Sequence, residues 1–358
     1  MRVSEEVELP NRRALFPEAY KGSKQEKRVV LMKLHAPFIQ LPLLFDAALL
    51  AKEISSFEET AWLPHPAGFA GNDFLPLISA EGDPRNEAFE GPMRPTPFLS
   101  SERPYLFQTL ASVGAVLGRT RLMRLSAHAA VDEHVDVNYY WRDRMRVHVP
   151  ILTQPSVRFH AGGANVHMAP GECWIFDTWS LHRVDNDSSS RRVHLVADTV
   201  GGQGFWGLMM AGRTAGAASS NWAPQTIAPS DGAAALEFEN LNAPLVMSPW
   251  ELREQLGFLL AEAVPNQPQL PQLARAASAL VHKWRALWAR YGDSEAGIPR
   301  FRQVLEEFIA LSRAAKAQEI VLKNDVDFWA PLRGMVLDVA LSDQPRDKGA
   351  GEQRFKPN

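Results

Sequence analysis

The sequence predicts a mostly β core, a sandwich or barrel of the jelly-roll type, with flanking helices and an α-helical C-terminal domain. Short segments with alternating or fully apolar patterns recur between turn signals from residue 121 to residue 200. Beyond about residue 246, the apolar residues recur with helical spacing instead. Between the two patterns lies a stretch rich in Ala, Gly, Ser and Pro, a composition that is typical of a connector.

Composition and charge exclude several classes of protein. The chain has 358 residues, which is enough for one large domain and a smaller one. Its formal net charge of −3 argues against a broad basic surface, so we expect neither nucleic acid nor a membrane as a partner. Cys173 is the only cysteine, which excludes an intrachain disulfide. With no apolar secretion segment near the N-terminus, the sequence predicts a cytoplasmic protein.

The N-terminal part, residues 1–104, is predicted to contain a helix and long substrate-side loops that pack on the core. Apolar residues recur at helical spacing over residues 42–57, which predicts an amphipathic helix. Residues 62–104 are rich in Pro and Gly and are predicted to form long loops. A second helix is expected across residues 105–117, at the start of the core domain.

The core domain is predicted to span residues 105–210 and to consist of short strands. The clearest alternation lies in RMRVHVPIL, which places Arg146 and His148 on one face and valines on the other. A hairpin is expected across Gly162 and Gly163. The remaining predicted strands are RLMRLSAHA, ECWIFD and RRVHLVADTV.

The rest of the chain is divided into a linker over residues 211–245, a helical C-terminal domain over residues 246–345 and a disordered tail over residues 346–358. The apolar faces of the two longest helices either pack on the β core or form a homodimer contact. One face is marked by Leu273, Ala277, Leu280, Trp284, Leu287, Trp288 and Tyr291, and the other by Phe301, Val304, Leu305, Phe308 and Leu311.

The strongest signal for chemistry is the pair His134 and Asp136. Two residues apart on a strand, their side chains share a face. One imidazole and one carboxylate are two of the three ligands in the 2-His-1-carboxylate set that holds non-haem Fe(II). His182 follows a predicted buried strand and is the candidate for the third metal ligand. A lone His-x-Asp is more often a hydrogen-bonded strand pair than a metal site, so the prediction depends on His182 and on Arg192 further along.

Arg192 is predicted to bind a dicarboxylate co-substrate. The guanidinium is a planar, permanent cation that can bind a carboxylate through two hydrogen bonds. Side chains alternate along a strand, so one of Arg191 and Arg192 points inward and the other to solvent, and spacing alone barely separates them. Arg146 and His148 are candidate second contacts for the same anion, and the alternative is a buried polar network that only supports the fold.

Three stretches of the chain resemble the aspartyl/asparaginyl β-hydroxylase family, and within it the bacterial L-proline cis-4-hydroxylase branch: RLMRLSAHAAVDEHVDVNYYWRDRMRVHVPIL, NVHMAPGECWIFDTWSLHRVDN and SRRVHLVADTVGG. The resemblance covers about residues 121–202. It implies a double-stranded β-helix that uses Fe(II), with 2-oxoglutarate as co-substrate and O2 as oxidant. It also implies that His134, Asp136 and His182 are the iron ligands and that Arg192, not Arg191, binds 2-oxoglutarate.

Further residues and the reaction follow from the same resemblance. Arg146 and His148 fall on the family's R-x-H motif beside the co-substrate. Asp136 stands where the animal aspartyl hydroxylases have glycine, and its presence disfavours a halogenase. The implied reaction is hydroxylation of an unactivated C–H bond of an amino acid, peptidyl residue or similar small polar substrate, with succinate and CO2 as co-products. The alternative is a non-catalytic or 2-oxoglutarate-independent cupin-like metal-binding protein, which would have no need for Arg192.

Overall fold

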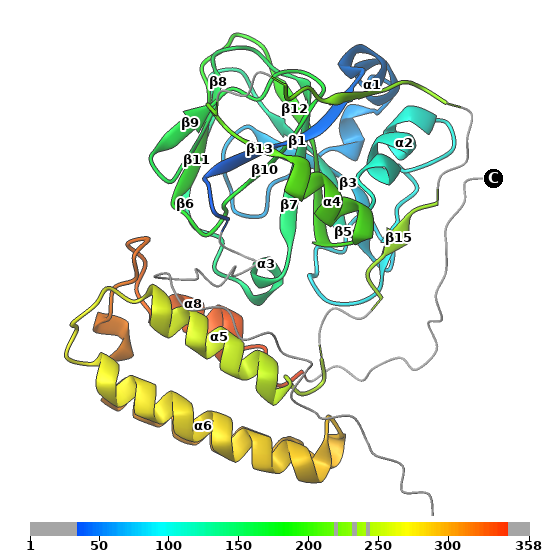
Figure 1. Cartoon of the computed structure of the whole chain (residues 1–358). Helices are drawn as coiled ribbons and strands as arrows, with labels where there is room; N and C mark the ends of the chain where they lie inside the picture. Colours follow the sequence, from blue (N-terminus) through cyan, green and yellow to red (C-terminus); the bar gives the residue numbers. More distant parts are fainter. Residues whose placement is uncertain (1–33, 218–220, 231–234, 241–243, 343–358) are drawn as a thin grey trace, which may run out of the picture.

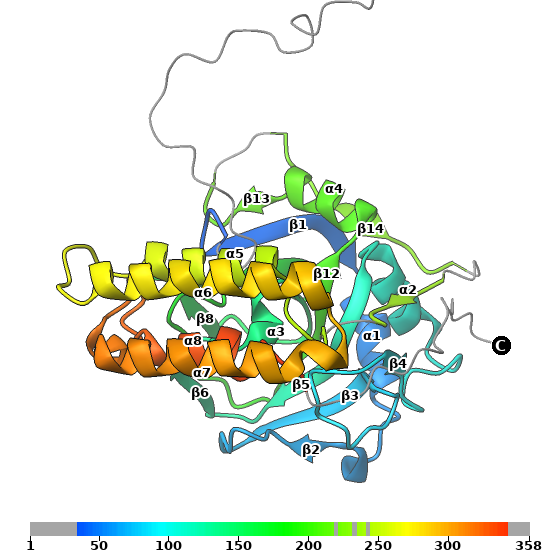
Figure 2. The ribbon, with the colours of Figure 1, turned by 90° about the horizontal axis from the view of Figure 1, so that it is seen from below.

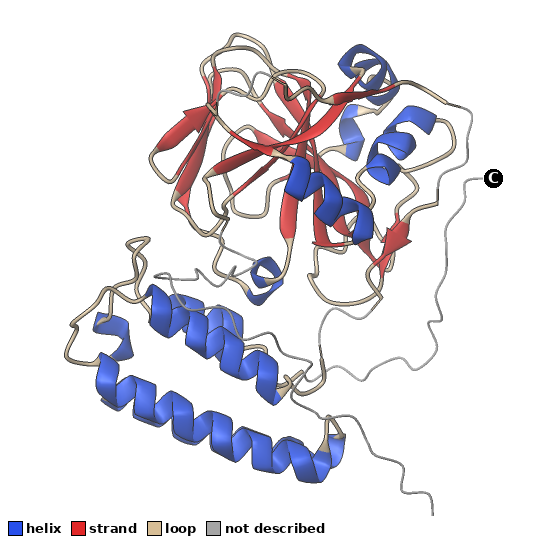
Figure 3. Ribbon diagram, in the orientation of Figure 1, coloured by secondary structure: helices blue, strands red, loops and turns tan. Residues whose placement is uncertain are grey.

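The computed structural model describes residues 34–217, 221–230, 235–240 and 244–342. A β-rich part carries helices on one side, and a separate layer of helices lies across its lower end (Figures 1 and 3). In the described ranges, no helix has the length and hydropathy that a membrane span requires. The predicted tail lies outside the described residues.

The larger of two sheets runs in the order β13-β1-β10-β7-β12-β5-β3-β2, with β14 beside β1, β15 beside β5 and β4 beside β3. All its pairs are antiparallel except β1 with β14 and β5 with β15. Its strands are β1 (Phe38–Phe45), β2 (Leu63–Pro64), β3 (Asn72–Ala80), β4 (Met93–Pro95), β5 (Val116–Leu125), β7 (Met145–Leu152), β10 (Glu172–Phe176), β12 (Arg192–Gly201), β13 (Arg213–Thr214), β14 (Gln225–Ile227) and β15 (Glu237–Phe238).

The smaller sheet runs in the order β6-β11-β8-β9. Its strands are β6 (Ala130–His134), β8 (Val157–Ala161), β9 (Ala164–Val166) and β11 (His182–Asn186). From β5 to β12 the chain repeatedly crosses between the two sheets, placing β5, β7, β10 and β12 in the larger sheet and β6, β8, β9 and β11 in the smaller one. Two sheets wound together in this way form a double-stranded β-helix, so the predicted fold class is confirmed.

Strand alternation gives the larger sheet an apolar outer face and a partly polar inner face. On β7, Val147 and Val149 point outward into a core that also contains side chains of the three covering helices. Arg146 and His148 point inward, and the His148 ring lies 5.5 Å from the Phe159 ring of the smaller sheet. This is the division that the alternation in β7 predicts. The covering helices are α1 (Ala47–Ile54), α2 (Pro104–Ser112) and α4 (Gln203–Ala211).

The C-terminal helices pack on the β part, which is one of the two arrangements expected for them. Their hydrophobic core is continuous with Tyr140, Trp141 and Trp179 of the β part. Figure 2 shows α6 and α7 side by side across that end, where the Trp284 and Phe301 rings are 4.7 Å apart. The helical elements are α3 (Tyr139–Arg142) in the β part, then α5 (Pro249–Glu262), α6 (Leu270–Tyr291), α7 (Ile298–Ala314), α8 (Trp329–Leu332) and a π-helical turn, η5 (Arg333–Leu337).

Of the twelve residues predicted on the apolar faces of α6 and α7, seven are buried, four are half-buried and one is exposed. Leu273, Leu280 and Phe308 lie in the core as expected. Leu311, placed on the buried face of α7 by its spacing, is 47% exposed. It lies near the end of α7, where the helix reaches the edge of the layer.

The prediction of a helix over residues 42–57 is wrong at its start. Residues 38–45 form strand β1, and the helix α1 begins only at Ala47. Asp46 caps this helix, since its carboxylate accepts a hydrogen bond from the Leu49 N–H at 3.0 Å. A fully buried strand is a continuous apolar run, and periodicity alone does not distinguish it from a buried helix.

The Pro- and Gly-rich region 62–104 also contains sheet where loops were predicted. Strand β3 pairs along most of its length with β5, and its apolar side chains are buried. Pro76 lies next to a shift in the β3–β5 register, which accommodates its missing N–H. The helix expected over residues 105–117 ends at Ser112, because Gly114 adopts a φ of +61° and the chain turns into β5.

Part of the predicted linker 211–245 belongs to the larger sheet. Its described residues include β13 and β14, which both pair with β1, and β15, which pairs with β5. Backbone pairing with an existing edge needs no apolar side chains, so the composition of the segment gave no sign of it.

Candidate metal centre

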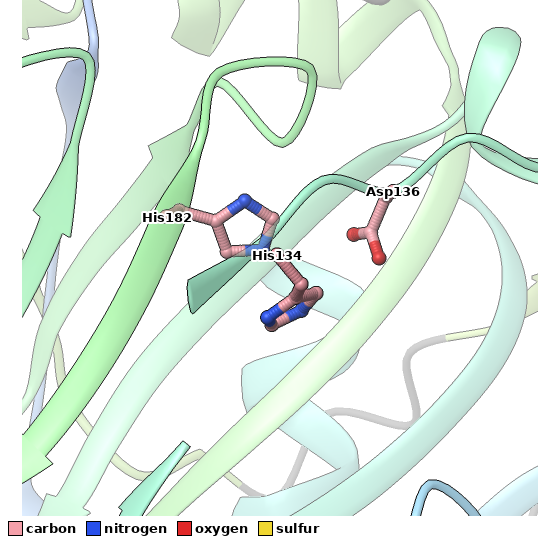
Figure 4. Close-up of side chains that lie close together, drawn as sticks. All are labelled: His134, Asp136 and His182. Carbon is pink, nitrogen blue, oxygen red and sulfur yellow. The ribbon is translucent and has the colours of Figure 1, made fainter. Parts of the chain in front are cut away.

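His134, Asp136 and His182 come together at one end of the smaller sheet (Figure 4). His134 ends β6, His182 begins β11, and the two are direct partners in the antiparallel register. Their ring centroids are 4.2 Å apart. The potential ligand atoms of the three residues all lie within 4.8 Å of one another. Each residue can therefore offer one atom to a single ion, as the sequence pattern predicted.

The position of Asp136 does not come from strand alternation, although its spacing from His134 predicted that it would. Strand β6 ends at His134, so strand alternation does not orient Asp136. Instead, its backbone N–H donates a hydrogen bond of 3.1 Å to the carbonyl oxygen of Thr178, in the loop before β11. The Asp136 Oδ2 atom lies 3.4 Å from Arg146 Nη1, is buried and accepts no hydrogen bond from the described residues. Such an oxygen is suited to contact a cation.

Both histidines are held through Nδ1. The Nδ1 atom of His134 lies 2.7 Å from the carbonyl oxygen of Asp132, and that of His182 lies 2.9 Å from the carbonyl oxygen of Ser180. When Nδ1–H donates to a carbonyl, the Nε2 lone pair is free to bind a metal ion. Burial lowers the pKa of His182 to about 4, so the ring is neutral at pH 7, as a metal ligand must be.

Arg191 and Arg192 are adjacent in the chain but lie in different environments. Arg191 is exposed and lies 3.3 Å from Glu59, whereas Arg192 is only 4% exposed and points inside the β-helix. The Arg192 guanidinium lies 5.0 Å from the centre of the Phe159 ring, and its Nε atom has no partner among the described residues. Burial lowers its pKa to about 9, which still leaves a cation at pH 7. An anion is the natural complement for a buried cation of this kind.

His148 and His194 lie beside Arg192 with unsatisfied polar atoms. Both rings are buried, and neither nitrogen of either ring has a partner in the described part of the chain. The rings lie 5.9 Å apart, and burial lowers both pKa values well below the ordinary value, so both imidazoles are neutral. Buried polar groups are normally paired, so this cluster is suited to a polar ligand.

Arg146 is engaged with carboxylates rather than free for an anion. Besides contacting Asp136, its Nε atom lies 3.3 Å from Asp198 Oδ1, and its guanidinium covers the Trp141 ring at 3.9 Å. Asp198 is 2% exposed and also lies 3.9 Å from Arg119. These contacts are those of a buried polar network that supports Asp136.

Arg121, His65 and Phe69 also lie around this end of the β-helix, and the sequence pattern did not predict them as site residues. Arg121 is 6% exposed, has no ion-pair partner among the described residues and lies 5.1 Å from the Phe74 ring. The pKa of His65 falls to about 4, chiefly through burial and then through the charges of Arg121 and other nearby cations. The Phe69 ring lies 5.8 Å from the His134 ring. The spacing of Arg119 and Arg121, two residues apart in β5, could have indicated the inward face of this strand.

The buried histidines predict a pH dependence of stability. Because the pKa of folded His194 is depressed, the unfolded chain binds a proton below pH 6.5 that the folded chain does not. The stability of the metal-free protein is therefore expected to fall as the pH drops from 7 to 5, with each such histidine contributing up to about 1.4 kcal/mol per pH unit. Urea unfolding at pH 7, 6 and 5 measures this slope. His194→Leu should reduce it and the exposed His128→Leu should not, whereas an unchanged slope in His194→Leu would contradict the argument.

The double-stranded β-helix and the His-x-Asp···His cluster at its end define a cupin-like protein with a candidate metal centre. Residues 93–201 match the sequence model of the aspartyl/asparaginyl β-hydroxylase family. The match confirms the predicted resemblance to this family over this part of the chain. It leaves out the C-terminal helices and most of the N-terminal segment.

Other comparisons are weaker. No curated protein matches the chain. A 2OG-Fe(II) oxygenase-family oxidoreductase from Burkholderia pseudomallei is 14% identical, with 44% of this chain and 79% of that chain covered and a TM-score of 0.29. A prolyl-4-hydroxylase from Pseudomonas putida is also 14% identical, with 46% and 92% covered and a TM-score of 0.32.

Proposed function

We propose that the protein is an Fe(II)- and 2-oxoglutarate-dependent dioxygenase that hydroxylates an unactivated C–H bond of a small polar substrate, such as an amino acid or a peptidyl residue. The observation that carries the proposal is the convergence of His134, Asp136 and His182 within 4.8 Å, with the buried Arg192 on the same inner surface. Two imidazoles and one carboxylate are the donor set for non-haem Fe(II), and three protein ligands leave positions open for other molecules.

The inner surface also fits the co-substrate. A dicarboxylate with one end at the metal centre needs a cation and hydrogen-bond donors for its other end. Arg192 supplies the cation, and neutral His148 and His194 each offer one N–H donor beside it. These three side chains carry the unpartnered buried nitrogens that a carboxylate would satisfy. A cupin-like protein that binds only a metal ion has no use for them, which argues against the alternative function.

In this proposal, Arg192 binds the distal carboxylate of 2-oxoglutarate, and His148 and His194 fix its orientation. The apolar ring of Phe159 lies next to both Arg192 and His194 and packs against this end of the inner surface. Arg146 holds the Asp136 carboxylate in place through its ion pair. When bound, the ferrous ion supplies the oxidising chemistry in which O2 and 2-oxoglutarate give succinate, CO2 and one oxygen atom for the substrate hydroxyl.

The cations around the metal centre indicate the substrate's charge. Arg121 is buried on the inner face of β5 without an ion-pair partner among the described residues, close enough to His65 to lower its pKa. His65 in turn is linked to the metal centre through Phe69, which contacts His134. A substrate with an anionic group, such as the carboxylate of an amino acid, would satisfy Arg121 while its C–H bond faces the metal centre.

Replacing Arg121 with methionine tests this assignment. We expect the KM for the prime substrate to rise about 10- to 100-fold, because a charge-assisted hydrogen bond contributes about 1.5–3 kcal/mol. Metal binding and the KM for 2-oxoglutarate should not change. Arg124→Met is the matched control, because Arg124 lies on the same strand but pairs with Glu59 and Asp73. A wild-type KM in Arg121→Met would exclude Arg121 from substrate binding.

Succinate release measures the proposed activity directly. The purified protein is incubated with Fe(II), ascorbate and 2-oxoglutarate, first alone and then with a panel of free amino acids and short peptides. We expect slow succinate formation without added substrate and a marked stimulation by the prime substrate. Absence of any Fe(II)-dependent binding or turnover of 2-oxoglutarate would exclude the dioxygenase and favour the 2-oxoglutarate-independent alternative.

A further inference from the structure

The loop between β10 and β11 holds two of the candidate metal ligands through its backbone. The carbonyl oxygen of Thr178 accepts the hydrogen bond from the Asp136 N–H at 3.1 Å. The carbonyl oxygen of Ser180 lies 2.9 Å from His182 Nδ1. The orientation of both peptide groups depends on the residue between them, Trp179, so the position of this one residue influences both ligands.

Trp179 is held by the C-terminal part of the chain at both its side chain, through α5, and its backbone, through a turn before α8. Its indole Nε1–H donates to Glu262 Oε2 at 3.1 Å, and Asn324 Nδ2 donates to its carbonyl oxygen at 2.9 Å. Its ring also lies 4.9 Å from the Phe258 ring of α5. With 1% of its surface exposed, Trp179 is part of the helical core although it belongs to the β-helix loop.

A second set of contacts reaches the segment that follows Asp136. Tyr139 Oη donates to Glu251 Oε1 at 2.6 Å, and Arg142 Nη2 donates to Glu254 Oε1 at 2.9 Å. Both acceptors lie on α5 and both donors lie on α3. The C-terminal helices therefore contact the segments next to Asp136 and next to His182, but none of these contacts involves a candidate ligand itself.

We infer that the C-terminal helical layer positions the metal ligands, and that Trp179, held by Glu262 and Asn324, is the positioning residue. The inference rests on the proposed function, in that the three donors bind a metal ion. Groups that hold metal ligands in orientation typically change metal affinity by about 10- to 100-fold when they are lost. Without its two anchors, the Trp179 loop would sample other conformations, and the donors at Asp136 and His182 would spend less time in the binding geometry.

Trp179→Phe, compared with Trp284→Phe, separates positioning from simple loss of stability. Trp284 is also fully buried in the helical core and also donates one indole hydrogen bond, to the Met247 carbonyl oxygen at 2.8 Å. Among the described residues, its hydrogen bond and its ring contact reach Met247 and Phe301, which lie outside the ligand loop. Each variant thus loses one comparable bond. Metal-free protein is titrated with Co(II), which replaces Fe(II) and reports its coordination by visible absorption. We expect Trp179→Phe to bind Co(II) about 10-fold more weakly, with an altered spectrum, and Trp284→Phe to bind it like the wild type.

A second pair of variants keeps the test decisive if Trp179→Phe folds poorly. Glu262→Gln retains an oxygen acceptor for the indole and should bind Co(II) nearly as the wild type does, whereas Glu262→Leu removes the acceptor and should weaken binding. Wild-type affinity and spectrum in both Trp179→Phe and Glu262→Leu would overturn the positioning role and leave the proposed function intact. Failure of the wild-type protein to bind Co(II) at all would instead refute the metal centre, and the positioning role with it.

Discussion

His182→Ala is expected to abolish metal binding and turnover in a folded protein. His182 is one of only two imidazoles in the cluster, and its Nε2 lone pair is the one left free by the Nδ1 contact with Ser180. Losing a direct donor should cost more than the about 10- to 100-fold that loss of a supporting group costs. We therefore expect at least a 100-fold loss of Fe(II) affinity and no detectable succinate release, as measured by calorimetry on the metal-free protein and by product analysis.

His160→Ala is the matched control for this variant. His160 lies on β8, next to β11 in the same sheet, and its Nε2 atom is 2.9 Å from Asp185 Oδ2. It is not one of the three convergent donors. Removing it should leave metal affinity and turnover near the wild-type values. If His182→Ala retained Fe(II) binding, or if His160→Ala lost it, the ligand assignment would be wrong.

Arg192→Met is expected to weaken 2-oxoglutarate binding about 100-fold while leaving iron binding unchanged. Arg192 is the buried cation beside the unpartnered His148 and His194, and methionine keeps much of its volume without the charge. Charge-assisted hydrogen bonds contribute about 1.5–3 kcal/mol, and 2.8 kcal/mol is about 100-fold in affinity. The measurements are the KM for 2-oxoglutarate and, separately, the affinity of the metal-free variant for Fe(II).

The neighbouring Arg191→Met provides the control, because Arg191 is exposed and pairs only with Glu59 among the described residues. Its KM for 2-oxoglutarate should match that of the wild type. Loss of iron from Arg192→Met with co-substrate binding retained would show that Arg192 supports the metal centre and not the dicarboxylate.

The sequence predicted those parts of the fold in which side-chain alternation reports burial. In β7 and β12, one face is polar and the other apolar, so the inward positions of Arg146 and His148 could be read from the pattern. The hairpin across Gly162 and Gly163 was predicted for a similar reason, because both glycines adopt a positive φ that favours glycine at a tight turn.

Strands that lack this alternation could not be predicted. Strand β1 is buried on both faces and resembles an apolar helix, while β3 contains a proline and lies between Gly- and Pro-rich turns. The short strands β13 and β14 join the sheet through backbone hydrogen bonds to β1, which depend little on side chains. Their positions are set by tertiary pairing, which a local pattern does not encode.

For the site, local spacing identified the candidate ligands but not what holds them. His134, Asp136 and His182 converge as the pattern predicted. The supporting contacts join segments far apart in the chain: Trp179 pairs with Glu262, 83 residues later. Such contacts follow from the packing of the helical layer, and no sequence spacing predicts them.

The most direct test of the account is an anaerobic titration of the metal-free protein with Fe(II) and 2-oxoglutarate, followed by visible absorption. If the three donors share one ion and Arg192 binds the co-substrate, a metal-to-ligand absorption band should appear only when both are present, saturate at one Fe(II) per chain and be absent in His182→Ala. A protein that gives no such band, or that gives it equally well without His182, would contradict the proposed metal centre.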